Sequence, residues 1–252
     1  MTKTGRTQRY AERGYLSGIP IFSDVESAKI RARFAEFEER EGKDRPQERN
    51  RNRHFELEWI WRVASDERIL SVMREIMGSD ILLIGTDFFC KYPGPEETKF
   101  IAWHQDVAYW GLKPPVAHTA WIAIDDSDAG NGCMRVIPES HLQGIVTHET
   151  SERHSNLLSI NQEIPDELVD TEKAVDVVLK AGEISVHHGQ MFHASTPNRS
   201  SRRRCGLTIR CVPPHVAQVE KNSLGTRWPA VLVSGEDKYG NFDLKPRPFS
   251  SA

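Results

Sequence analysis

The sequence has no apolar run as long as the roughly 18 residues that a transmembrane helix requires. It begins with MTKTGRTQRYAERGY, which lacks the apolar segment of a secretory signal peptide. Neither charge dominates, because 33 Lys and Arg residues stand against 36 Asp and Glu residues and the net charge is −3. We therefore expect a cytoplasmic protein with no membrane or nucleic-acid partner.

Cysteine is scarce, and no CxxC spacing occurs; the four cysteines are Cys90, Cys133, Cys205 and Cys211. In a cytoplasmic protein, such cysteines are expected to be reduced, buried thiols. The hydrophobic content of 38% and the charged content of 27% are ordinary for a globular protein. A chain of 252 residues is also long enough to bury a sizeable core.

The first part of the chain, residues 1–78, has mostly helical periodicity. We predict a short helix over residues 10–16 and two longer helices after it. Ser23 and Ser65 are suitable N-cap residues for these two helices, and Gly78 is a suitable end for the second. These helices are expected to flank a β core instead of forming a domain of their own.

Residues 79–213 contain short strand patterns separated by turn residues, a spacing typical of sandwiches and jelly rolls. Residues 214–252 show little periodicity and are expected to wrap the surface. The sequence therefore predicts a single domain over residues 1–252. Its fold class is mainly β with flanking helices.

The stretch FIAWHQDVAYW, residues 100–110, places His104 and Asp106 among apolar residues. Side chains alternate between faces along a strand, so these two point the same way and Gln105 points to the other face. That geometry suits two ligands of one metal ion. An isolated HxD is more often a pair of surface residues, but a carboxylate in a half-buried strand needs a partner, because unpaired burial is costly.

A third ligand has to come from a distant part of the chain, where His187, His188 and His193 compete. The adjacent His187 and His188 face opposite sides if they lie on one strand, so at most one of them points inward. Two histidines and one carboxylate form the facial triad of non-haem Fe(II) oxygenases. Such a triad leaves three positions open for a chelating keto acid and O₂.

Several motifs, in this order, resemble the phytanoyl-CoA dioxygenase-like (PhyH) family of Fe(II)/2-oxoglutarate-dependent oxygenases. They are WHQD with His104 and Asp106, AHTAWIAIDD with Trp121, NGCMRVIPESH at 131–141, and HASTPNRSSRRR from His193 to Arg204. The resemblance covers most of the chain up to about Pro213. It implies a double-stranded β-helix core, which is a cupin-like jelly roll. Glu139 departs from the family's usual glycine, although it touches no ligand.

The resemblance selects His193 as the third ligand beside His104 and Asp106, and it makes this triad the catalytic metal centre. It implies that Arg204 binds the distal carboxylate of 2-oxoglutarate, a role that suits a planar guanidinium. Further positions that contact the cosubstrate in the family are occupied by Ser195, Trp121 and Gln105.

The resemblance also implies the reaction and its cofactors. Fe(II), 2-oxoglutarate and O₂ would together hydroxylate an aliphatic C–H bond of the substrate, with release of succinate and CO₂. Halogenating members of the family have a small residue in place of the metal-binding carboxylate. The presence of Asp106 therefore favours hydroxylation.

The sequence says less about the identity of the substrate. The arginines of ERNRNRHFE, residues 48–56, and Arg135 are candidates for binding an anionic group, although solvated or ion-paired arginines are at least as common. Tyr109 is a candidate for the pocket entrance or for the core, and Asn131 is placed near the iron by the resemblance alone. We expect a small polar or anionic metabolite, such as an amino acid-like compound, a phosphonate or a natural-product intermediate.

Other functions stay open as alternatives. An acyl-CoA hydroxylase of the same family is less favoured, because no additional segment for the CoA moiety is evident. A zinc hydrolase would need a positioned general base, and no HExxH motif occurs. A non-catalytic jelly-roll binding protein would have no need to keep the triad and Arg204, yet all four residues are present. A nucleic-acid demethylase would need a basic stripe with interleaved aromatics.

Overall fold

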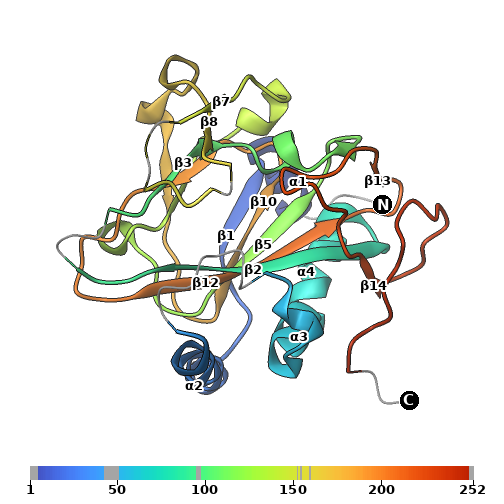
Figure 1. The fold of residues 1–252 in the computed structure, drawn as a ribbon, viewed down its shortest axis with the longest axis horizontal. Coiled ribbons are helices and arrows are strands. Elements are labelled where there is room, and N and C mark those ends of the chain that lie inside the picture. The colour runs from blue at the N-terminus through green and yellow to red at the C-terminus, as the bar shows by residue number, and fades with distance from the viewer. Residues whose placement is uncertain are drawn as a thin grey trace.

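The computed structural model describes residues 5–42, 51–94, 98–151, 153, 155–158 and 160–249. Within these residues, the core consists of a six-stranded sheet in the order β1-β10-β5-β12-β2-β14 and a four-stranded sheet in the order β3-β11-β6-β9. The long helices lie against the large sheet, on the side away from β3 (Figure 1). The expected jelly-roll core with flanking helices is confirmed.

Four α-helices precede the long strands in the described part of the chain. They are α1 (Gly5–Arg13), α2 (Asp24–Glu41), α3 (Glu58–Ala64) and α4 (Glu67–Met77). None of these helices is long and apolar enough to cross a membrane. Short 3₁₀ turns lie at Arg53–Phe55, Asp106–Tyr109, Ala129–Asn131, Ser140–Gln143, Asp166–Leu168 and Thr171–Lys173.

Between β2 and β12 the chain crosses repeatedly from one main sheet to the other. The large sheet contains β1 (Tyr15–Pro20), β2 (Ile81–Lys91), β5 (His118–Ala123), β10 (Glu183–His188), β12 (Arg204–Val212) and β14 (Val231–Ser234). The small sheet contains β3 (Ile101–His104), β6 (Met134–Val136), β9 (Val175–Val177) and β11 (His193–Ser195). Two short pairs complete the set: β4 (Leu112–Lys113) with β13 (Ala217–Gln218), and β7 (Glu149–Thr150) with β8 (Gln162–Glu163).

The caps of the long helices agree only in part with the sequence pattern. Ser23 caps α2, because its side chain accepts from the backbone N–H of Glu26 while the Glu26 carboxylate accepts from the backbone N–H of Ser23. The cap of α4 is Asp66, whose carboxylate accepts from the backbone N–H of Arg68. The prediction of Ser65 as this cap is wrong, because Ser65 ends the preceding helix α3.

The first helix lies earlier in the chain than the predicted residues 10–16. The helix α1 ends at Arg13, and Gly14 adopts a left-handed conformation with φ of 78°. The chain then enters β1, which pairs with β10 at the edge of the large sheet. Tyr15 and Leu16, which were expected to be helical, therefore belong to a strand.

The two faces of the large sheet are chemically different, and β12 shows this clearly. This strand lies between β5 and β2 (Figure 1). Its residues Cys205, Leu207, Ile209 and Cys211 join the apolar cluster that also contains buried residues of the helices. The alternate residues Arg204, Thr208 and Arg210 line a cavity on the opposite face.

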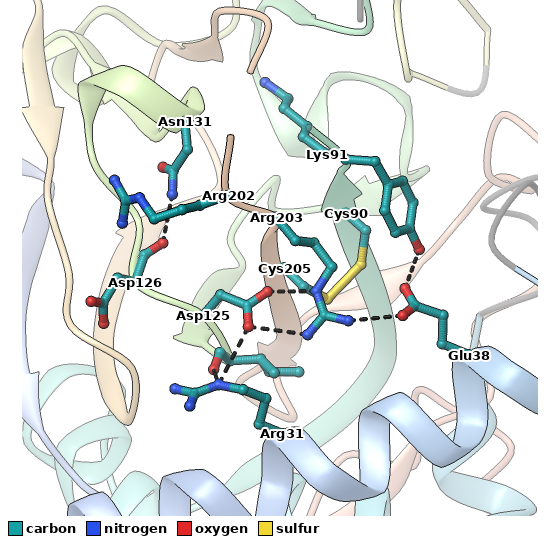
Figure 2. Close-up of polar contacts among 12 residues, drawn as sticks. Arg31, Glu38, Cys90, Lys91, Asp125, Asp126, Asn131, Arg202, Arg203 and Cys205 are labelled. Atoms are coloured by element: carbon teal, nitrogen blue, oxygen red, sulfur yellow. Dashed lines mark hydrogen bonds and ion pairs between the residues drawn. A yellow bond between two sulfur atoms is a disulfide. The ribbon is translucent and has the colours of Figure 1, made fainter. Parts of the chain in front are cut away.

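Two of the cysteines correct the expectation of four reduced thiols. Cys90 on β2 and Cys205 on β12 stand opposite each other in the strand register and form a disulfide (Figure 2). The residues lie 115 positions apart in the sequence, so only the pairing of the two strands brings them together. Cys133 and Cys211 are free and buried, as expected.

A group of ion pairs connects α2 to the large sheet (Figure 2). The Arg203 guanidinium lies 2.7 Å from the Asp125 carboxylate and 2.8 Å from the Glu38 carboxylate. Arg31 reaches the same Asp125 at 3.4 Å, and the Tyr92 hydroxyl donates to Glu38. Arg203 is therefore a structural ion-pair partner and not part of a solvated basic surface.

The C-terminal segment does more than wrap the surface. Its strand β14 pairs with β2 and extends the large sheet, and β13 pairs with β4. Residues between these two strands line the cavity: Asn222, Ser223, Leu224 and Trp228. The low periodicity of this segment did not indicate either role.

Candidate metal centre and cosubstrate pocket

The small sheet brings two distant histidines together. His104 ends β3, and His193 begins β11, which pairs with β3 so that these two residues stand opposite each other. Their ring centroids are 4.0 Å apart. The strand does not continue to the next candidate ligand, because Asp106 begins a 3₁₀ turn. Gln105 is still extended, with φ of −116° and ψ of 127°, so the expected alternation holds up to Asp106.

The three candidate ligands converge on one point. Asp106 Oδ1 lies 3.6 Å from His104 Nε2 and 3.8 Å from His193 Nε2. The ligand atoms of these residues all lie within 4.8 Å of one another. His104, Asp106 and His193 therefore have the composition and arrangement of a facial triad, which suits Fe(II).

The hydrogen bonds of the two histidines leave the metal-facing nitrogens free. His104 Nδ1 lies 2.9 Å from the carbonyl oxygen of Ala102, and His193 Nδ1 lies 3.0 Å from that of Met191. A carbonyl only accepts, so each Nδ1 carries the proton and donates it. Each Nε2 then has a lone pair that points toward Asp106, as a metal ligand requires.

The protonation states also fit a metal. Burial lowers the pKa of His193 well below its ordinary value, and the nearby His104 lowers it further, so the ring is neutral. Burial by itself would raise the pKa of Asp106, but contacts with His104 and His187 outweigh it and hold this pKa well below the ordinary value. A neutral imidazole and an ionised carboxylate are the forms that bind metal.

Two further residues contact the Asp106 carboxylate from the large sheet. The Thr119 hydroxyl donates to Asp106 Oδ2 at 3.1 Å, and His187 Nε2 lies 3.4 Å from the same oxygen. The two residues are neighbours across β5 and β10. Sequence reasoning did not identify Thr119, and it left His187 unassigned; the HH pair only indicated that one of the two histidines points inward.

His188 faces the other side of the same strand, as alternation predicts. Its ring lies 5.3 Å from that of His118, whose Nδ1 is 2.8 Å from the hydroxyl of Tyr10. This group is separated from the metal centre by the sheet itself. His188 is therefore not a candidate ligand.

Gln105 does not face the pocket, so its proposed contact with the cosubstrate is wrong. Its side chain is fully buried and donates to the carbonyl oxygens of Gly144 and Gln190, while its oxygen accepts from the backbone N–H of Val146. All of its hydrogen-bonding groups are used within the protein. Gln105 therefore connects the loop around Gly144 to the end of β3.

Arg204 lines the cavity and has the features of an anion-binding residue. It is buried, with 2% of its surface exposed, and its Nε has no hydrogen-bond partner among the described residues. Burial lowers its pKa to about 10, which still leaves it charged at neutral pH. A buried guanidinium without a carboxylate partner is costly, so the site fits a ligand that supplies the carboxylate.

Trp121 and Ser195 line the same cavity as Arg204, as expected for cosubstrate positions. The Arg204 guanidinium lies 5.0 Å from the centre of the Trp121 ring. That ring covers Gly206, where an added Cβ would come within 1.9 Å of it, so only glycine leaves room for this stacking. Ser195 Oγ accepts from the buried ammonium of Lys91 at 2.6 Å, which leaves the hydroxyl proton available for a ligand.

Two of the three substrate candidates lie outside the cavity. Asn131 is buried in a turn, where its amide donates to the Asp126 carbonyl oxygen (Figure 2). Its side-chain oxygen accepts from the backbone N–H of Asp128. Arg135 alternates with the buried Met134 and Val136 on β6, so it faces outward and pairs with Asp176 at 3.0 Å. A capped turn decides the position of Asn131, and strand register decides that of Arg135.

Tyr109 does line the cavity, together with residues from distant segments. Leu157, Leu158 and Gln162 come from the long excursion after β6, and Trp228 comes from the C-terminal segment. Of the proposed arginines at 48–56, residues 48–50 lie outside the described residues. Arg51 lines the cavity, whereas Arg53 pairs with Glu41 and Glu56.

The comparisons with known proteins agree with this geometry. The phytanoyl-CoA dioxygenase (PhyH) family model matches residues 10–206. A probable alpha-ketoglutarate-dependent hypophosphite dioxygenase from Stutzerimonas stutzeri is 26% identical over 219 residues, which cover 80% of this chain and 76% of that protein. The L-proline trans-4-hydroxylase of Streptomyces griseoviridis is 33% identical over 123 residues, which cover 42% of this chain and 46% of that protein.

The solved apo structure of the non-heme monooxygenase ThoJ has the same fold. It is 28% identical in sequence, with a TM-score of 0.79, and the match covers 97% of this chain and 89% of ThoJ. The family match spans well over half of the chain, and it contains both the triad and Arg204. The chain belongs to the phytanoyl-CoA dioxygenase family of Fe(II)- and 2-oxoglutarate-dependent oxygenases.

Proposed function

We propose that this protein is a dioxygenase that hydroxylates an aliphatic C–H bond of a small polar or anionic metabolite and releases succinate and CO₂. The observation that carries the proposal is the convergence of His104, Asp106 and His193 in a cavity that Arg204 also lines, with Arg204 Nε unpaired among the described residues. A relative that oxidises hypophosphite and another that hydroxylates proline support a small substrate.

In this proposal, the triad holds Fe(II), and the bound metal with 2-oxoglutarate supplies the oxidative chemistry. Arg204 binds the distal carboxylate of 2-oxoglutarate, and the Ser195 hydroxyl donates a hydrogen bond to the same end. The Trp121 ring packs against the Arg204 guanidinium and helps to orient it. These contacts orient the keto acid toward the metal side of the cavity.

The residues around the triad keep its ligands in one arrangement. Thr119 donates to one oxygen of Asp106, which leaves the other oxygen for the metal. The carbonyl groups of Ala102 and Met191 hold the two imidazoles with Nε2 forward. Leu157, Leu158 and Leu224 line the cavity with apolar surface, which favours exclusion of water.

The test is substrate-dependent succinate formation by the iron-loaded protein with 2-oxoglutarate and a panel of small amino acids, phosphonates and phosphinates. We expect His104→Ala to abolish succinate formation, because it removes a metal ligand. His215→Ala is the matched control, since His215 is exposed and does not line the cavity, and it should retain wild-type turnover.

Two outcomes would contradict the proposal. Wild-type turnover by His104→Ala would exclude the metal centre. Product formation with Zn(II) in place of Fe(II), without consumption of 2-oxoglutarate, would indicate a hydrolase.

A further inference from the structure

A second arginine of β12, Arg210, also lies in the cavity, and the metal centre does not use it. Arg210 is six residues after Arg204, so the two side chains leave the same face of the strand. Only 8% of its surface is exposed, and it lines the cavity. It lies over Trp110, with 5.4 Å between the guanidinium carbon and the ring centre, which holds the guanidinium plane in one orientation.

The strand register places Arg210 on the metal side of the cavity. Arg210 stands opposite Thr119 of β5, and the Thr119 hydroxyl donates to Asp106. Arg204 stands opposite Lys91 of β2, at the other end of the strand. At roughly 3.3 Å per residue, the two arginine backbones are about 20 Å apart. The two guanidinium groups therefore approach the metal centre from different ends of the cavity.

The charges around Arg210 are incompletely matched. Its Nη1 donates to the buried carboxylate of Asp87, and Arg51 Nε lies 3.7 Å from the other oxygen of that carboxylate. Both residues line the cavity beside Arg210. Arg210 Nε has no hydrogen-bond partner among the described residues, and neither has Asp87 Oδ1.

A structural ion pair in a protein interior normally satisfies its donors, because each unsatisfied buried charge is costly. Arg210 does not meet this condition. Burial and the nearby Arg51 lower its pKa to about 9, which is the direction expected for a cation with too little compensating negative charge. A ligand anion would supply that charge, as 2-oxoglutarate is proposed to do at Arg204.

We propose that Arg210, assisted by Arg51, binds an anionic group of the substrate on the side of the metal away from Arg204. The group is a carboxylate or an oxyanion of phosphorus, because either accepts two parallel hydrogen bonds from a guanidinium. Asp87 orients Arg210, and its negative charge lowers the affinity of Arg210 for an anion. This inference rests on the proposed function, since it assigns the substrate class of that site.

The first experiment measures binding without turnover. The protein is loaded with Mn(II) in place of Fe(II) and saturated with 2-oxoglutarate, so that the metal and Arg204 are occupied. It is then titrated in a calorimeter with isobutyrate, with methylphosphonate, and with the neutral isostere isobutyramide. We expect saturable binding of at least one anion at least about tenfold tighter than that of isobutyramide, a difference of about 1.4 kcal/mol. The tighter of the two anions identifies the preferred headgroup.

Variants then test whether Arg210 is responsible. In Arg210→Gln, the affinity for the preferred anion should fall about tenfold or more, because a charge-assisted hydrogen bond is lost. In Asp87→Asn, the same anion should bind more tightly, because the competing carboxylate is gone. Arg202→Gln is the matched control: Arg202 is on the same segment but pairs with Asp128 outside the cavity, so it should bind as the wild type does.

The inference is overturned if isobutyramide binds as tightly as both anions, or if Arg210→Gln keeps the wild-type affinity. Should Arg210→Gln not fold, Asp87→Asn decides: tighter anion binding supports the site, and unchanged or weaker binding overturns it. Because no turnover is involved, these results are independent of succinate formation. An active enzyme without the anion site would refute this inference alone, and an inactive protein with the anion site would refute only the proposed function.

Discussion

Strand β12 has an apolar face that packs against the helices and a polar face that lines the cavity. Leu207 and Ile209 belong to the helix-facing core and are almost fully buried. Arg204 and Arg210 are nearly as buried, yet each has an unsatisfied donor. Similar burial thus has opposite consequences, because apolar burial stabilises the fold whereas a buried donor without a hydrogen-bond partner destabilises it.

The two faces of β12 differ in their capacity to bind a ligand. On the helix-facing side, β12 contributes only apolar side chains and cysteines, which pack against the helices. On the cavity side, Arg204 Nε and Arg210 Nε have no hydrogen-bond partner among the described residues, and a bound anion would provide one. The two faces can be separated by experiment, because one should control the free energy of unfolding and the other should control ligand affinity.

The largest expected effect is on the apolar face. Leu207→Ala should lower the free energy of unfolding by about 2–5 kcal/mol, because it leaves a cavity in the main core. Chemical denaturation measures this, and the exposed Leu142→Ala serves as the control with a change within about 0.5 kcal/mol. The comparison between the faces fails if Leu207→Ala is as stable as the wild type.

The next effect is on the cavity face. Arg204→Gln should weaken 2-oxoglutarate binding about tenfold to a hundredfold, because a hydrogen bond to a charged group is worth about 1.5–3 kcal/mol. The free energy of unfolding should change little, since the lost group has no protein carboxylate partner. Calorimetric titration of the Mn(II)-loaded protein measures the affinity, with Arg202→Gln as the control. Unchanged affinity in Arg204→Gln would assign the cosubstrate carboxylate to another residue.

The smallest effect concerns acid stability, which should come from the histidines on the helix-facing side. Burial lowers the pKa of His118 to about 3 and that of His188 to about 4, from an ordinary value of 6.5. Below pH 6.5 the unfolded chain therefore binds more protons than the folded protein, and acidification favours unfolding. The loss should develop between 6.5 and about 4 for His188 and should extend to about 3 for His118.

Thermal unfolding at pH 7 and pH 5 measures this loss. The melting temperature should fall on acidification, and the fall should be smaller in His118→Phe, which removes one of the two groups. A full wild-type decrease in that variant would show that other groups cause the acid sensitivity.

Much of the site was predictable because its residues lie in short motifs. The HxD motif with its apolar flanks indicated His104 and Asp106, and the interval from His193 to Arg204 agreed with the family pattern. Strand alternation correctly turned Gln105 away from the metal, whereas the family resemblance placed it at the cosubstrate. A local rule about side-chain direction was here more reliable than the family pattern.

The wrong expectations about the site depended on turns and strand pairings that the motifs do not specify. Asn131 and Arg135 come from a motif that resembles the family's, but a capped turn and the register of β6 direct them elsewhere. Cys90 and Cys205 pair only because β2 and β12 are neighbours. No spacing within the sequence contains that information.

By itself, the sequence indicated the fold class, the triad and Arg204 as the candidate for the cosubstrate carboxylate, because periodicity and short motifs are local properties of a chain. Tertiary structure alone decided which polar residues share the cavity with the triad. Thr119, Asp87 and Arg210 reach it from strands that pair across the large sheet, and Leu224 and Trp228 reach it from the C-terminal segment. Their positions depend on strand register and on packing between residues far apart in the chain, which local patterns do not encode.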